Sequence, residues 1–127
     1  MSQPIVYVDT SEVRDRQLEE LKVAMKELAS FVEVNMPRLL SYAFYLNADQ
    51  TQMTVVAVHP DSASLAFHLD TGAAEFRKFA SLLELSSIEV YGHVSETVVD
   101  RLQEKARMLG SGTVRVLDFY AGFARPE

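Results

Sequence analysis

Histidines and tyrosines are the side chains of this sequence whose types and spacing suit acid–base chemistry. His68 is the first candidate, because Leu65 and Gly72 lie three and four residues away and would share one face of a helix with it. An imidazole that points inward titrates near neutral pH, which suits a general base for an acidic phenol or enol. The alternative is a structural histidine that bonds the backbone or lies half exposed. His68 is therefore a candidate catalytic base.

The other two histidines follow predicted strands. His59 precedes Pro60, where we favour a turn residue whose ring bonds the start of the next helix, and His93 follows Gly92. The three histidines stand nine and twenty-five residues apart, which matches no local metal-ligand pattern. The chain also has no cysteine, which removes thiolate ligands and thiol nucleophiles. We therefore expect no metal site and no cofactor.

The tyrosines are candidate substrate contacts, because a buried phenol needs a hydrogen-bond partner and a ligand can supply one. If a four-residue loop joins the two strands of a hairpin, Tyr42 shares a face with Met53, and Tyr45 lies on the opposite face. A change of one residue in that loop would regroup both faces. We select Tyr45 and Tyr91, together with His93, as the expected substrate-binding residues.

The elements that must position these side chains form a single domain, residues 1–127, because this length and a hydrophobic content of 48% are typical of one globular unit. The net charge of −6 and the scattered basic residues disfavour nucleic-acid binding. No apolar run approaches the ~18 residues of a membrane span. Residues 1–8 lack the features of a signal peptide. We expect a cytoplasmic protein that binds neither nucleic acid nor membrane.

Hydrophobic periodicity and turn residues give the order of the elements. Strands are predicted at 5–8, 39–46, 52–58, 88–91 and 113–123, and helices at 13–34, 62–69, 74–84 and from 95 to a cap at Gly110. Gly72 is interpreted as a break between two helical pieces. The order β-α-β-β-α-β, followed by an added α-β, predicts a ferredoxin-like α+β fold with an antiparallel sheet and helices on one face.

Both faces of the predicted sheet are apolar. Residues 39–46 are apolar or aromatic at both alternations apart from Ser41, and residues 53–58 show the same pattern. Helices cover one face, so the other needs a second cover. We expect a homodimer in which the sheet face packs against that of a second copy. The alternative is an internal cover such as the additional C-terminal helix.

Several stretches resemble a known family. They are residues 40–46, the turn at 47–50, residues 53–58, and residues 61–69 followed by Phe76-Arg77-Lys78-Phe79. Together they resemble the antibiotic biosynthesis monooxygenase-like proteins of the dimeric α+β barrel superfamily. The resemblance spans residues 5–85, and its most specific part is Leu65-x-x-His68 followed by Phe76 and Phe79. It implies a ferredoxin-like protomer whose sheet packs on that of a partner.

The same resemblance implies a range of activities. The family includes cofactor-free oxygenases, isomerases and members without demonstrated activity. Its haem-degrading members use an Asn–Trp–His set, and this chain has no Trp, so haem degradation is not expected. The leading hypothesis is a cofactor-independent monooxygenase acting on a quinol-like or polycyclic aromatic small molecule. The alternatives are a non-catalytic module that binds a small apolar ligand or assembles with partners, and thirdly an isomerase.

Overall fold

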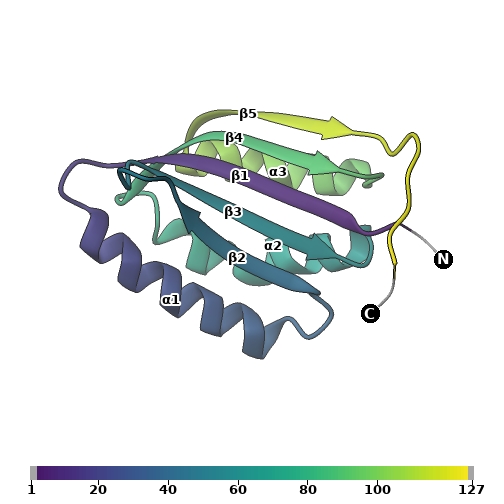
Figure 1. The fold of residues 1–127 in the computed structure, drawn as a ribbon, viewed down its shortest axis with the longest axis horizontal. Coiled ribbons are helices and arrows are strands. Elements are labelled where there is room, and N and C mark those ends of the chain that lie inside the picture. The colour runs from purple at the N-terminus through teal and green to yellow at the C-terminus, as the bar shows by residue number, and fades with distance from the viewer. Residues whose placement is uncertain (1–2, 126–127) are drawn as a thin grey trace.

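A computed structural model of the chain describes residues 3–125. Its elements follow one another as β1 (Ile5–Val13), α1 (Leu18–Asn35), β2 (Ser41–Leu46), β3 (Gln52–His59), α2 (Ser62–Arg77), β4 (Leu83–Tyr91), α3 (Glu96–Leu109) and β5 (Gly110–Leu117). Figure 1 shows one sheet with helices packed against it. Residues 1 and 2 of the segment assessed for a signal peptide lie outside the described residues.

The five strands form one sheet in the order β2-β3-β1-β4-β5 (Figure 1). The first four strands pair antiparallel in the order of the ferredoxin-like unit, which confirms the predicted fold class. β5 instead pairs parallel with β4, so the complete sheet is mixed. The parallel pairing follows from α3, because a helical crossover brings the chain back to the sheet in the same direction.

Some element boundaries differ from the predicted ones because tertiary pairing decides them. β1 continues to Val13, where the predicted helix was to begin, since β3 and β4 pair with it on both sides. β5 begins at Gly110, which is also the predicted C-cap of α3, and ends at Leu117, so the last strand begins and ends before its predicted bounds of 113 and 123. Asp118, which the predicted strand included, follows β5 instead.

Gly72 does not break α2, which is continuous from Ser62 to Arg77. The glycine is needed for close packing within the helix. A Cβ at Gly72 would lie 2.4 Å from Cζ of Phe76, so any side chain there would displace the buried aromatic ring. The predicted interruption is therefore wrong, and the residue that suggested it makes room for Phe76.

One face of the sheet is covered by all three helices. Alternate residues of β1 point toward it and are at most 4% exposed, namely Ile5, Tyr7, Asp9 and Ser11. Leu28 of α1, Phe76 of α2 and Lys105 of α3 meet these strands in one interior space. α3 therefore lies on the same face as α1 and α2, and the alternative in which it covers the second face is wrong.

The second face of the sheet carries no helix among the described residues. It is formed by the intervening positions, such as the half-buried Val6, Val8 and Val56, and by the exposed Tyr45. Within residues 3–125, no helix combines the length and apolar character needed to cross a bilayer.

Candidate functional site

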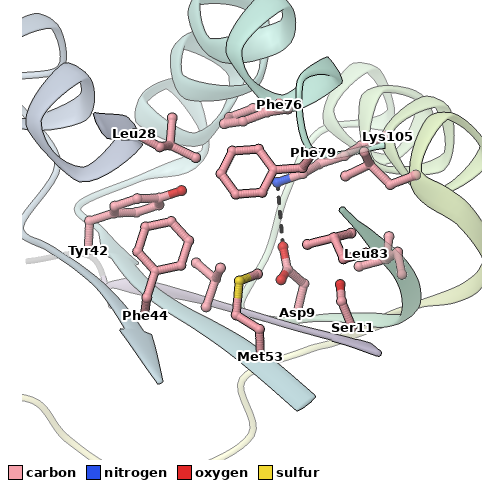
Figure 2. A pocket seen from close by; sticks show the side chains of 13 residues that line it. Asp9, Ser11, Leu28, Tyr42, Phe44, Met53, Phe76, Phe79, Leu83 and Lys105 are labelled. Carbon is pink, nitrogen blue, oxygen red and sulfur yellow. Dashed lines mark hydrogen bonds and ion pairs between the residues drawn. The ribbon is translucent and has the colours of Figure 1, made fainter. Parts of the chain in front are cut away.

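A cavity lies between the sheet and the helices on the covered face (Figure 2). Its volume is about 20 Å³, which is room for one water molecule. Most of its wall is apolar, and the polar side chains that reach it are Asp9, Ser11, Tyr42 and Lys105. Figure 2 shows the Lys105 amine and the Asp9 carboxylate pointing toward one another, with Tyr42 on the other side of the cavity in this view.

Asp9, Tyr7 and Lys105 form a buried polar cluster. Lys105 Nζ donates to Tyr7 Oη at 2.8 Å, and Tyr7 Oη donates to Asp9 Oδ2. Lys105 Nζ also lies 3.5 Å from Asp9 Oδ2, and the two side chains are only 8% and 4% exposed. The same Nζ is 4.0 Å from the centroid of the Phe76 ring, a cation–π distance. Because little water screens these charges, they interact more strongly than a surface pair.

Burial shifts the pKa values of this cluster. Desolvation lowers the pKa of Lys105, and the neighbouring Asp9 carboxylate opposes that shift only in part. Burial, and then the negative charge of Asp9, raises the pKa of Tyr7 well above its ordinary value. Burial likewise raises the pKa of Tyr42. Both tyrosines therefore remain protonated near pH 7, whereas Lys105 releases its proton more readily than an exposed lysine.

The predicted site did not include Asp9 or Lys105, although the sequence marks both. Asp9 continues the inward alternation of Ile5 and Tyr7, where an unpaired carboxylate would be costly. Lys105 lies three residues after Leu102 and four before Leu109, on the apolar stripe of α3. The signal that could have predicted this pair is an acidic residue at an inward position of β1 together with a basic residue on the apolar face of α3.

Ser11 adds a second functional group to the cavity wall. It is 1% exposed, and its Oγ has no hydrogen-bond partner among the described residues. A buried hydroxyl without a partner destabilises the fold, since it loses its bonds to water. Ser11 Oγ is therefore free to donate to, or accept from, a molecule bound in the cavity.

His68, the predicted base, is 1% exposed on the covered face. Its Nδ1 lies 2.8 Å from Sδ of Met36. A thioether can only accept, so Nδ1 carries the proton and Nε2 carries the lone pair. That Nε2 has no partner among the described residues. Desolvation, and then the charge of Lys105, lowers the pKa of His68 well below its ordinary value, so the ring is neutral near pH 7.

His68 does not line the cavity. Its ring packs against those of Tyr42 and Phe76, with centroid distances of 5.3 and 5.1 Å, and these two rings form part of the cavity wall. The predicted base therefore lies behind the residues that a ligand would touch. Asp9 and Lys105 reach the cavity directly.

His59 bonds the start of the following helix, as the sequence suggested. Its Nδ1 is 2.9 Å from Oγ of Ser64 in the first turn of α2. The residue is fully buried, and desolvation lowers its pKa to about 4. Its ring contacts that of His68 at a centroid distance of 5.4 Å. Within residues 3–125, no group of three His, Asp or Glu side chains is arranged to hold a metal ion.

The remaining predicted substrate contacts lie away from the cavity. Tyr45 is 57% exposed and faces the second side of the sheet, opposite to Tyr42 as predicted, in a hairpin whose register pairs Leu46 with Met53. Tyr91 is 40% exposed at the end of β4, and His93 is exposed just after it. The structure does not bring these three residues together with His68.

A larger hollow opens at the surface between α2 and α3, with a volume of about 310 Å³. Phe76 and Lys105 line both this hollow and the internal cavity. Arg101 of α3 and Asp70 of α2 both line the hollow and form an ion pair, with 2.7 Å between Nε and Oδ1. Lys105 is therefore the polar side chain that borders both spaces.

No family model matches the chain, and no curated protein matches its sequence. Solved structures match its fold. MupZ from Pseudomonas fluorescens is 22% identical, with a TM-score of 0.76 over 98% of this chain and 97% of that one. Two further proteins are provisionally named antibiotic biosynthesis monooxygenases. The one from Bacteroides thetaiotaomicron is 20% identical, with a TM-score of 0.55 over 65% of this chain and 85% of its own. The one from Chloroflexus aurantiacus is 16% identical, with a TM-score of 0.59 over 73% and 95%.

These matches differ in how much of the chain they include. The last two cover most of their own length but only 65% and 73% of this chain. The match to MupZ covers 98% of this chain, so it includes α3 and β5. At these identities the similarity shows the fold alone.

Proposed function

Because the chain has the fold of the antibiotic biosynthesis monooxygenase-like proteins of the dimeric α+β barrel superfamily, we propose that it is a cofactor-independent monooxygenase for a small, acidic aromatic molecule such as a quinol. A fold does not determine a reaction, so the proposal depends on side chains. The observation that carries it is the buried Asp9–Lys105 pair facing a cavity whose wall is mostly apolar. Apolar walls suit an aromatic ring, and the pair suits removal of a phenolic proton.

In the proposed reaction, Asp9 accepts the proton of a phenol or enol, and the Lys105 ammonium lies beside the anion that forms. The anion transfers an electron to dioxygen, and the two radicals combine into a hydroperoxide on a ring carbon. Loss of water from the hydroperoxide leaves a carbonyl group. For an anthrone, one CH₂ group and O₂ give C=O and H₂O, so the substrate supplies all the electrons.

Substrate binding requires movement of the cavity wall, because about 20 Å³ is smaller than any aromatic ring. Phe44 and Phe79 stack across the wall with centroids 6.5 Å apart and planes 9° apart. Phe44 belongs to the edge strand β2 and is half-buried, so it can turn outward at lower cost than a fully buried residue. In this proposal the substrate ring takes the place of Phe44 beside Phe79.

Oxygen uptake with anthrone and a panel of quinols tests this proposal. Asp9→Asn keeps the shape of the side chain but removes the base, and a loss of 10²- to 10⁴-fold, roughly the range for a general base, is expected. Tyr45→Phe, on the second face of the sheet, is the matched control and should leave uptake unchanged. Uptake that survives Asp9→Asn but is lost in a folded His68→Ala variant would return the role of base to His68.

A binding module is the second candidate, and one observation favours it. The cavity is largely filled by the chain's own side chains, including Tyr42, Phe44 and Met53. If the wild-type protein consumes no oxygen with any member of the panel, this alternative replaces the monooxygenase.

The second face of the sheet is the proposed homodimer interface. Its apolar residues Val6, Val8 and Val56 lie side by side on β1 and β3, where Val8 pairs directly with Val56. Exposed Tyr45 adds an aromatic ring to the same face. Burial of such a surface against a second copy removes apolar area from water and so favours association.

A further inference from the structure

We propose that the Lys105 amine forms a covalent imine with a small aldehyde or ketone that reaches it through the hollow between α2 and α3. This inference goes beyond oxygenation and does not depend on it. In its protonated form Lys105 would balance a phenolate. In its free-amine form it is a nucleophile.

Lys105 differs from every other lysine of the chain in its surroundings. Lys22, Lys26 and Lys78 are half-buried or exposed, whereas Lys105 is buried among aromatic and aliphatic side chains. Its Nζ has one carboxylate, Asp9, at 3.5 Å, and one hydroxyl, Tyr7, at 2.8 Å. A buried site of this kind stabilises the ammonium less than water does, which is the usual way that a lysine becomes nucleophilic near neutral pH.

Other titratable and charged groups face this amine from the surrounding elements. They are Tyr7 and Asp9 on β1, Tyr42 on β2, His59 on β3, His68, Asp70 and Arg77 on α2, and Arg101 and Glu104 on α3 itself. Arg101 is paired with Asp70 and Glu104, so these charges largely balance. Both histidines have lowered pKa values and are neutral near pH 7. Asp9 is therefore the group that most favours the ammonium form.

The neighbours of Lys105 can also move the protons that imine formation requires. The amine lone pair attacks the carbonyl carbon, and the nitrogen proton passes to the oxygen to give a carbinolamine. The carbinolamine hydroxyl then leaves as water when it gains a proton, and the nitrogen loses its remaining proton to give C=N. Tyr7 Oη lies between Asp9 and Lys105 and is placed to relay both protons.

Access to Lys105 comes from the surface hollow. The hollow has a volume of about 310 Å³, and Lys105 lines it together with the apolar Leu69, Ala73, Phe76 and Met108 and the charged Asp70, Arg77, Arg101 and Glu104. A small carbonyl compound with a short apolar chain can contact the apolar part of this lining. Because the Lys105 amine is buried and points toward Asp9, the amine has to turn toward the hollow, or the compound has to pass the Lys105 side chain, before the two meet.

Reductive trapping with propanal and sodium cyanoborohydride at pH 7, followed by peptide mapping, tests the proposal. The reagent reduces an imine to a stable propyl-amine, which marks the lysine that formed it. A lysine whose pKa is lowered has a larger free-amine fraction at pH 7 than one whose pKa is raised. We therefore expect Lys105 to be labelled several-fold faster than Lys78, whose pKa is raised by Glu75 and which serves as the internal control.

Two variants separate nucleophilicity from structure. Lys105→Met should abolish the fast label and leave that on Lys78 unchanged. Asp9→Asn removes the group that favours the ammonium, so the midpoint of the labelling rate against pH should move to lower pH, which a purely structural role would not cause. Mapping on the wild-type chain needs neither variant to fold. Labelling confined to the other lysines, or of Lys105 only after unfolding, would overturn the proposal. Oxygen uptake is a separate measurement, so failure of either proposal is distinguishable from failure of the other.

Discussion

Removal of the Lys105 charge tests most directly how much the buried Asp9–Lys105 pair contributes to the free energy of unfolding. Lys105→Met keeps an unbranched side chain of similar length but leaves the Asp9 carboxylate in the core without its cation. At a separation of 3.5 Å the pair attracts by about 5 kcal/mol at an effective dielectric constant near 20. The carboxyl can escape this loss by taking up a proton, which costs an ordinary aspartate about 4 kcal/mol at pH 7. The expected loss of unfolding free energy is therefore about 3–4 kcal/mol.

Urea unfolding followed by circular dichroism at pH 7 measures this loss. A second variant distinguishes the cost of an unpaired charge from the cost of altered packing. In Tyr7→Phe/Asp9→Leu/Lys105→Met, no member of the cluster remains unpaired, and the stability should return to within about 1–2 kcal/mol of wild type, because apolar replacement of a buried ionic cluster is often neutral. A Lys105→Met variant that loses less than about 1 kcal/mol, or a triple variant less stable than it, would refute the reasoning.

Three further outcomes are expected. Burial lowers the pKa of His59 from 6.5 to about 4. Its neutral form therefore contributes stability that is full above pH 6.5 and is lost as the pH falls toward 4, with about 2 kcal/mol lost by pH 5. Urea unfolding at pH 7 and at pH 5 should show a smaller pH dependence in His59→Gln than in the wild type, and the same pH dependence as the wild type in the exposed His93→Gln. Gly72→Ala should lower the unfolding free energy by about 1–2 kcal/mol, since the new Cβ displaces Phe76, and a more stable variant in thermal melts would contradict this. Val56→Asp should convert the proposed homodimer to a folded monomer in light scattering, and a wild-type protein that is already monomeric at micromolar concentration would exclude the interface.

The sequence predicted the order of elements because each signal is local. The helical repeat that ends near Asn35 and the alternation before and after the hairpin depend only on neighbours along the chain. Boundaries failed where distant segments decide them. Val13 is a strand residue because β3 and β4 flank it, and Gly72 is helical because Phe76 packs over it. The local patterns had placed Val13 at the start of a helix and Gly72 at a break between two helices.

The site was predicted less well, for a related reason. His68 was chosen by residue type and helical position, and the structure buries its neutral ring behind the cavity wall. Which side chains border a cavity depends on how elements cross, and Asp9 and Lys105 lie 96 residues apart in the chain. Tyr45 was assigned to the correct face relative to its strand partners, but the hairpin alone does not show which face the helices cover.

Lys105 belongs to α3, outside the βαββαβ unit that ends with β4. A chain that stopped at Tyr91 would keep a complete ferredoxin-like topology, but Asp9 would then face a cavity that holds a carboxylate and no cation. Such a cavity would repel anionic ligands, whereas the cavity with Lys105 can accept them. Gain or loss of α3 and β5 during evolution would therefore change whether the cavity accepts or repels anionic ligands. The reactions that this fold can support would then depend on whether the chain includes that helix and strand.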